Sequence, residues 1–150
     1  MSTEPFTVRL RVPVYEIDPQ LHLNGSAYMR FADESRHACV RAAGVSVEGL
    51  LGDGLGPVNL ETLIRYHHEL RLGDEVDVSC VWTWGTGKTY RVEHVFRRMD
   101  GEPAAEVNYV SGVIDLRARR LVPDPAQVWL SRAERPELLG LPTAEPVSSG

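Results

Sequence analysis

The hydrophobic period of this sequence changes from strand-like alternation to helical spacing and back again, and these changes limit the folds that the chain can adopt. From residue 26 to 43, apolar and small side chains recur at helical spacing, with charged side chains on the opposite face. Other segments alternate between apolar and polar residues, which is typical of half-buried strands. These segments are residues 6–16, 58–70, 75–84, 89–98 and 104–117. The pattern therefore predicts one strand, one long helix and then four more strands.

Short turn signals separate the last four strands, so consecutive strands are expected to pair antiparallel. A helix with a wide apolar face needs a sheet to cover it. We therefore predict an α+β fold in which a five-stranded antiparallel sheet wraps around one long helix. Such a sheet keeps exposed edges, and pairing the edges of two protomers would remove one of them. A homodimer, or a homotetramer built from dimers, is expected.

Several local features refine this prediction. We expect short helices at residues 46–51 and 125–133, and a bulge in the last strand at Gly112. Gly44 is expected to end the long helix. The positions of Trp82, Trp84 and His94 on apolar strand faces predict that these three side chains belong to the core.

Length and composition indicate one globular domain over residues 1–150, with a core at about 6–119 and a disordered tail from about 142. The net charge of −5 and the pI near 5.5 argue against a nucleic-acid partner. Cys39 and Cys80 form neither a disulfide framework nor a metal-ligand spacing. No leader-like or membrane-spanning run is present, so we expect a cytoplasmic protein without a membrane partner.

The segment that joins the first strand to the long helix carries the best candidates for chemistry. Asp18, His22 and Asn24 lie within seven residues, directly before the predicted helix N-terminus. Unpaired N–H groups and the positive end of the helix dipole can bind a developing oxyanion there. A nearby carboxylate can act as a base or as a nucleophile. Asp and Asn are also common as caps and turn residues, and this purely structural interpretation stays open.

A longer pattern surrounds these residues. The run Y-x-x-D-x-x-x-H-x-N-x-x-x-Y-x-x-F-x-x-E-x-R, from Tyr15 to Arg36, resembles the signature of hotdog-fold acyl-CoA thioesterases, in the branch similar to 4-hydroxybenzoyl-CoA thioesterase. Arg65-Tyr66, Leu72-Gly73-Asp74 and Gly87-Lys88-Thr89 resemble later parts of that branch, and the likeness covers about residues 6–119.

The resemblance implies a hotdog fold and the hydrolysis of an acyl-CoA or acyl-carrier-protein thioester to a free acid and a thiol. Asp18 matches the catalytic carboxylate, as general base or as nucleophile, and the Gly25 N–H matches the group that polarises the thioester carbonyl. Asn24 and His22 match polar residues that orient the water or the carboxylate. No metal and no separate cofactor are implied, because coenzyme A is part of the substrate. The residues matched to substrate binding are Tyr28, Arg36, Gly56, Lys88 and Thr89.

The sequence also departs from the family pattern, and two other functions were weighed. Leu21 stands where many members have glycine, and Gly25 stands where many have a second asparagine. A hotdog hydratase or dehydratase is the first alternative, but the Asn-Pro that it usually carries between the acid and the histidine is absent. A non-catalytic acyl-CoA-binding domain is the second, although such a domain gains little from a carboxylate beside a thioester. The identity of the acyl group is left open.

Overall fold

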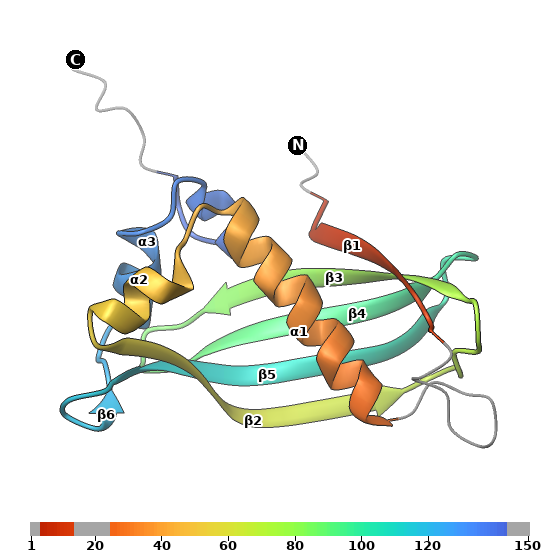
Figure 1. The fold of residues 1–150 in the computed structure, drawn as a ribbon, viewed down its shortest axis with the longest axis horizontal. Coiled ribbons are helices and arrows are strands. Elements are labelled where there is room, and N and C mark those ends of the chain that lie inside the picture. Colours follow the sequence, from red (N-terminus) through yellow and green to blue (C-terminus); the bar gives the residue numbers. More distant parts are fainter. Residues whose placement is uncertain (1–3, 14–24, 144–150) are drawn as a thin grey trace, which may run out of the picture.

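The computed structural model describes residues 4–13 and 25–143 of the chain, and Figure 1 shows their arrangement. One long helix lies across one face of an antiparallel sheet, and short helices gather near one end of it. The elements in chain order are β1 (Phe6–Arg11), α1 (Gly25–Ala42), α2 (Val47–Gly52), β2 (Leu55–Tyr66), β3 (Glu75–Trp84), β4 (Tyr90–Arg98), β5 (Pro103–Asp115), β6 (Arg120–Leu121), α3 (Pro125–Leu130) and the 3-10 helix η2 (Pro136–Leu139).

The strands form one antiparallel sheet in the order β1-β3-β4-β5-β2, and the two-residue strand β6 pairs with β5. The prediction of an α+β hotdog fold, with one long helix packed on an antiparallel sheet, is confirmed. The predicted segment 26–43 agrees with α1 to within one residue at each end. Gly44 follows the helix with a φ of +82°, the left-handed conformation that favours glycine after a helix.

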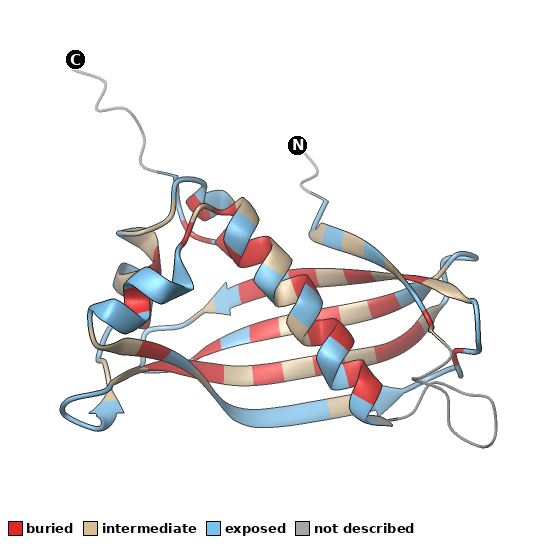
Figure 2. Cartoon of the chain, viewed as in Figure 1, coloured by how far each residue is buried: buried red, intermediate tan, exposed pale blue. Residues whose placement is uncertain are grey.

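The predicted faces of the two central strands are also confirmed. Every second side chain of β4 is buried, beginning at Tyr90, and β3 alternates in the same way (Figure 2). Trp82 and His94 lie in the core, and Trp84 is half-buried against it. Alternation with a period of two was therefore a sufficient signal for these strands.

The predicted bulge at Gly112 is wrong. Gly112 pairs in register with Val58, and the irregularity lies across the ladder, in β2, between Asn59 and Glu61. A Cβ at position 112 would lie 2.9 Å from Leu121 Cδ2 and 3.2 Å from the Lys88 carbonyl oxygen. Close packing, and not a bulge, therefore requires glycine there.

The extra residue in β2 also changes which side chains of that strand are covered. Leu60, Leu63 and Tyr66 are all exposed, although alternation along 58–70 predicts that one face of the strand is buried. Toward the end of the strand, Ile64 packs against the core and the exposed Tyr66 touches it through the ring of Tyr28. The strand thus carries an apolar surface that the described residues do not bury.

The apolar core is divided along α1 into two clusters. The first cluster surrounds the N-terminal half of the helix and includes Tyr28 and Phe31. The second surrounds the C-terminal half and includes Val40, Trp82 and Trp129. A single helix therefore joins two separately packed regions, and its middle turns face polar groups between them.

The two edges of the sheet differ in chemistry. Along β1, Arg9 pairs with Asp77 at 2.8 Å and Arg11 with Glu75 at 3.1 Å, so charged side chains line this edge. Charged residues are a common protection of an exposed edge. β2 ends the sheet on the other side, where Leu63 and Tyr66 are exposed beside the charged Glu61 and Arg65. Of the two edges, β2 is the better suited to pair with another chain.

The longest described helix, α1, has 18 residues and carries too many charges to cross a lipid bilayer, and the other described helices are also unsuited to a span.

The C-terminal segment should depend on one glycine for its packing. Gly140 has a φ of +65°, and a Cβ there would lie 2.5 Å from the Trp82 carbonyl oxygen. Gly140→Ala adds left-handed strain and a backbone overlap, so we expect a loss of about 2 kcal/mol of unfolding free energy in urea titrations. Gly85→Ala is the matched control, because a Cβ at Gly85 meets nothing within 4 Å. Equal unfolding midpoints for the two variants would contradict the close packing on Trp82.

Candidate functional site

A cavity of about 260 Å³ lies between the C-terminal half of α1, the helix α2, the helix α3 and the sheet. Most of its wall is apolar, and its polar residues come from α1, β2 and β5. The polar and small lining residues are Arg36, His37, Gly56, Pro57, Asn59 and Ser111; the apolar and aromatic ones are Val40, Val47, Leu51, Val58, Trp82, Tyr90, Val92 and Trp129.

Aromatic rings close the inner end of this cavity. The Trp82 and Tyr90 rings stack with centroids 5.6 Å apart, and Trp129 meets Trp82 edge-on at 5.2 Å. Trp129 Nε1–H donates a hydrogen bond to the Tyr90 hydroxyl at 3.1 Å. Burial raises the pKa of Tyr90 to about 12, so the hydroxyl stays neutral and accepts this bond. The aromatic end is therefore rigid and uncharged.

Arg36 organises the polar part of the wall. Its Nη1 donates to Asn59 Oδ1 at 3.0 Å, and its Nη2 donates to Asp33 Oδ1 at 2.9 Å. The guanidinium carbon lies 5.0 Å from the centroid of the Tyr109 ring, and the Tyr109 hydroxyl donates to Asp33 Oδ1 at 3.3 Å. The Arg36 side chain is only 17% exposed. Its charge is thus balanced by a carboxylate and an aromatic face, as a partly buried cation requires.

Asn59 receives a second donor from the neighbouring strand. Ser111 Oγ donates to Asn59 Oδ1 at 2.9 Å, so this oxygen accepts from both Ser111 and Arg36. Asn59 and Ser111 are direct partners in the register of β2 and β5. Two donors on one atom identify it as the oxygen of the amide. The side-chain orientation of Asn59 is therefore fixed by its surroundings.

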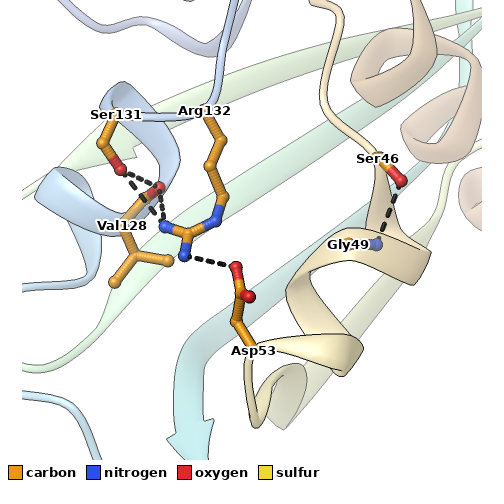
Figure 3. Close-up of polar contacts among 6 residues, drawn as sticks. All are labelled: Ser46, Gly49, Asp53, Val128, Ser131 and Arg132. Atoms are coloured by element: carbon orange, nitrogen blue, oxygen red, sulfur yellow. Dashed lines mark hydrogen bonds and ion pairs between the residues drawn. The ribbon is translucent and has the colours of Figure 1, made fainter.

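An ion pair joins the two short helices beside the cavity (Figure 3). Arg132 follows α3, and its Nη2 lies 3.0 Å from Oδ2 of Asp53, the residue that caps the C-terminus of α2. Arg132 Nη1 also donates to the Val128 carbonyl at 3.2 Å. This exposed pair contributes little to overall stability. It nevertheless links the helices that supply Leu51 and Trp129 to the cavity wall.

The start of α2 is fixed independently of this ion pair. Ser46 caps the helix, because Gly49 N–H donates to the Ser46 hydroxyl at 3.0 Å (Figure 3). The predicted short helix over 46–51 is thus present as Val47–Gly52, and the one predicted from residue 125 is present as α3.

The structure brings together two of the residues expected in the site. Arg36 and Gly56 both line the cavity, although they come from α1 and β2. Tyr28 lies elsewhere, in the first core cluster, where its ring meets Tyr66 edge-on at 5.3 Å. Lys88 and Thr89 lie in the exposed connection between β3 and β4, outside the cavity wall.

The remaining expected residues lie at the start of α1 or before it. Gly25 is the first residue of the helix, where N–H groups lack intrahelical acceptors. Asp18, His22 and Asn24 lie outside the described residues. Arg36 lies eleven positions after Gly25, which corresponds to about 16 Å along a helix. The helix start and the cavity are therefore distinct places within one chain.

Sequence reasoning did not identify Asn59, Ser111 or Asp33, nor the role of Trp129 in the cavity wall. A polar residue at an inward-facing strand position is the sequence signal that could have identified such a residue. Ser111 is an example, because it lies on β5 and is buried. Glu61 and Arg65 are exposed on β2 and are not among the residues that line the cavity. Within residues 4–13 and 25–143, no group of three His, Cys, Asp or Glu side chains is arranged to hold a metal ion.

Comparisons with known proteins identify the family of the chain and agree with its fold. Residues 12–131 match the model of a family described as the thioesterase-like superfamily. A search of curated proteins finds no match.

Solved structures similar to the chain share its fold. A 1,4-dihydroxy-2-naphthoyl-CoA thioesterase from Synechocystis superposes with a TM-score of 0.76 at 14% identity, over 85% of this chain and 96% of that one. A hypothetical protein from Aquifex aeolicus gives 0.74 at 25% identity, with coverages of 83% and 96%. A hypothetical protein from Staphylococcus aureus, in complex with CoA, gives 0.77 at 20% identity, with coverages of 95% and 89%.

A buried histidine under this site gives the protein a pH dependence. His94 is fully buried, its Nδ1 lies 2.9 Å from the Ser79 carbonyl oxygen, and its ring meets Tyr109 edge-on. Nε2 has no partner among the described residues. Burial lowers the pKa of His94 from 6.5 to about 4, so the folded protein keeps the ring neutral.

We expect His94 to destabilise the fold as the pH falls from about 6.5 to 4. In this window the unfolded chain binds a proton that the folded chain does not, and the full effect is about 3 kcal/mol. Unfolding free energies measured at several pH values should therefore fall less steeply in His94→Phe than in the parent. The parent and the variant would show the same pH slope if His94 were protonated in the folded state.

Proposed function

Because the chain belongs to the thioesterase-like superfamily, we propose that it hydrolyses an acyl-CoA thioester to a free acid and a thiol. The observation that carries this proposal is the family match over residues 12–131, which includes Asp18, Gly25 and the cavity residue Arg36. The Synechocystis neighbour is a CoA thioesterase and the Staphylococcus neighbour was solved with CoA, which supports coenzyme A as the carrier. An acyl-carrier protein is the second candidate carrier.

In the proposed mechanism, the thioester carbonyl approaches the start of α1. The Gly25 N–H and the helix dipole stabilise the oxyanion that forms when the carbonyl carbon becomes tetrahedral. In one route, the Asp18 carboxylate takes a proton from a water molecule as the water oxygen attacks that carbon. The C–S bond then breaks, and the proton passes from Asp18 to the leaving thiolate. His22 and Asn24 orient the water or the carboxylate.

A second route uses the same residues differently. The Asp18 carboxylate attacks the carbonyl carbon itself, the thiolate leaves with a proton from water, and a mixed anhydride forms. The hydroxide left by that water then attacks the acyl carbon of the anhydride, which releases the free acid and regenerates the Asp18 carboxylate. Both routes consume one water molecule and give one acid and one thiol.

We further propose that two protomers pair along β2. The exposed Leu63 and Tyr66 lie on this edge, and the opposite edge is lined by charged residues. An antiparallel twofold pairing would lay the two α1 helices side by side in opposite directions. Within one chain, the start of α1 and the cavity are about 16 Å apart. In the dimer, the start of α1 from one protomer would instead approach the cavity of its partner. A tetramer of two such dimers is a further expectation.

The reaction is tested with a panel of acyl-CoA thioesters and Asp18→Asn. Thiol release should be observed for at least one thioester, and Asp18→Asn should lower kcat and kcat/KM together by about 10²–10⁴-fold. Asp100→Asn is the control, because Asp100 is an exposed turn carboxylate whose hydrogen bond to Glu102 N–H an asparagine can replace. An Asp18→Asn protein with parental stability and parental turnover would exclude Asp18 as the catalytic group.

The pairing of protomers is tested by sedimentation velocity. The parent should sediment as a dimer or a tetramer, and Leu63→Glu should shift the population toward monomer, because a charge would be placed in the paired edge. Leu72→Glu changes a leucine of similar exposure (53% against 51%) in the connection before β3 and should sediment like the parent. A monomeric parent with full activity at nanomolar concentration would contradict the paired arrangement.

A further inference from the structure

The cavity beneath α1 and α2 has no part in the proposed bond-breaking steps, which take place at the start of α1. Resting on the proposed function, we infer that this cavity holds the acyl group of the substrate. The acyl group that fits is compact and apolar, with the bulk of about one ring. At the polar wall of the cavity, Asn59 donates a hydrogen bond to the acyl oxygen. Asn59 would then be a positioning residue for the substrate, and Trp129 would limit the size of the acyl group.

The size of the acyl group follows from the volume and from the closed aromatic end. An apolar cavity of about 150 Å³ in a protein can hold benzene. The present cavity, at about 260 Å³, has room for a ring with substituents or a branched chain of similar bulk. Trp82, Tyr90 and Trp129 form its end, and Trp129 is held in place by its hydrogen bond to Tyr90. A long unbranched chain would have to displace that indole.

The composition of the wall indicates an uncharged, apolar guest. Val40, Val58 and Val92 line the cavity from α1, β2 and β4, and Leu51 lines it from α2. Burial of apolar surface against such residues is favourable by about 25 cal/mol per Å². Among the lining residues that the structure describes, Arg36 is the one arginine or lysine, and its charge is balanced by Asp33 at 2.9 Å. A free charge on the guest would find no unpaired partner there.

The hydrogen bond from Asn59 follows from the bonds that its oxygen already makes. Asn59 Oδ1 accepts from Arg36 and from Ser111, so the amide nitrogen is the end left for another group. Nδ2 carries two N–H donors, and they have no partner among the described residues. Since Asn59 lines the cavity, an acyl carbonyl oxygen is a suitable acceptor for these donors. The Arg36 charge strengthens them by polarising the amide.

The test uses 4-bromobenzamide, a neutral ring compound whose carbonyl stands for that of the thioester and whose bromine quenches tryptophan fluorescence at contact range. Titration into the parent should give saturable quenching, because Trp82 and Trp129 line the cavity. Leu51→Glu should raise the Kd at least tenfold, and Leu72→Glu should leave it unchanged. Both leucines are about half exposed, but only Leu51 lines the cavity, so both variants are expected to fold.

Asn59→Asp tests the hydrogen bond separately. The aspartate keeps an oxygen for Arg36 and Ser111 but has no N–H groups to donate, so the Kd for 4-bromobenzamide should rise at least tenfold while the thermal unfolding midpoint stays close to that of the parent. A Kd unchanged by Asn59→Asp would overturn the role of Asn59. Quenching that does not saturate, or a Kd unchanged by Leu51→Glu, would overturn the assignment of the cavity.

Turnover distinguishes the failure of this inference from the failure of the proposed function. The parent should hydrolyse benzoyl-CoA with a higher kcat/KM than palmitoyl-CoA, and Trp129→Leu should narrow or reverse this preference by opening the closed end. Faster hydrolysis of palmitoyl-CoA by the parent would overturn the size limit and leave the thioesterase function standing. Saturable binding of 4-bromobenzamide without thiol release from any acyl-CoA would leave the cavity assignment standing and overturn the proposed function.

Discussion

The partial burial of the Arg36 guanidinium is the constraint around which the middle of this protein is arranged. A cation that is largely removed from water needs partners that replace its hydration. Asp33 supplies charge from the same helix, Tyr109 supplies an aromatic face from β5, and Asn59 supplies an oxygen from β2. These contacts fix α1 relative to the two strands at one end of the sheet order.

This polar region also explains why the core consists of two clusters. The helix α1 buries apolar side chains before and after its middle turns, but the middle turns face Asn59, Ser111 and the Tyr109 hydroxyl. The two clusters are therefore packed independently of each other. The C-terminal one surrounds a cavity that α2 and α3 help to enclose.

The sequence was a good guide where a repeated pattern decided the structure. The period of two identified β3 and β4 and their buried faces, and the period of 3.6 identified α1, because each signal is local and spans many residues. A single glycine was a poor guide: Gly112 could indicate either a bulge or close packing, and only the position of Leu121 decides between them. The family resemblance added the expected fold and the candidates at the helix start.

The cavity could not be predicted in the same way, because it depends on contacts between distant parts of the chain. The pairing of Asn59 with Ser111 depends on the register of β2 and β5, which the residue pattern does not determine. The place of Trp129 depends on the path by which the C-terminal segment returns to β3 and β4. Arg36 and Gly56 were identified only through the resemblance, and their meeting in one wall became clear from the structure.

The order of strands in the sheet has a consequence for synthesis on the ribosome. Among the described strands, β2 is bonded only to β5, and α1 finds much of its cover on β3 and β5, which are made later. From Ala42 at the end of α1 to Asp115 at the end of β5, 115 − 42 = 73 further residues must be made. At about 5–20 residues per second, this takes roughly 4–15 s. During that interval the apolar stripe of α1 and both edges of β2 are uncovered in the nascent chain, which makes this the period when the protein most needs protection by chaperones.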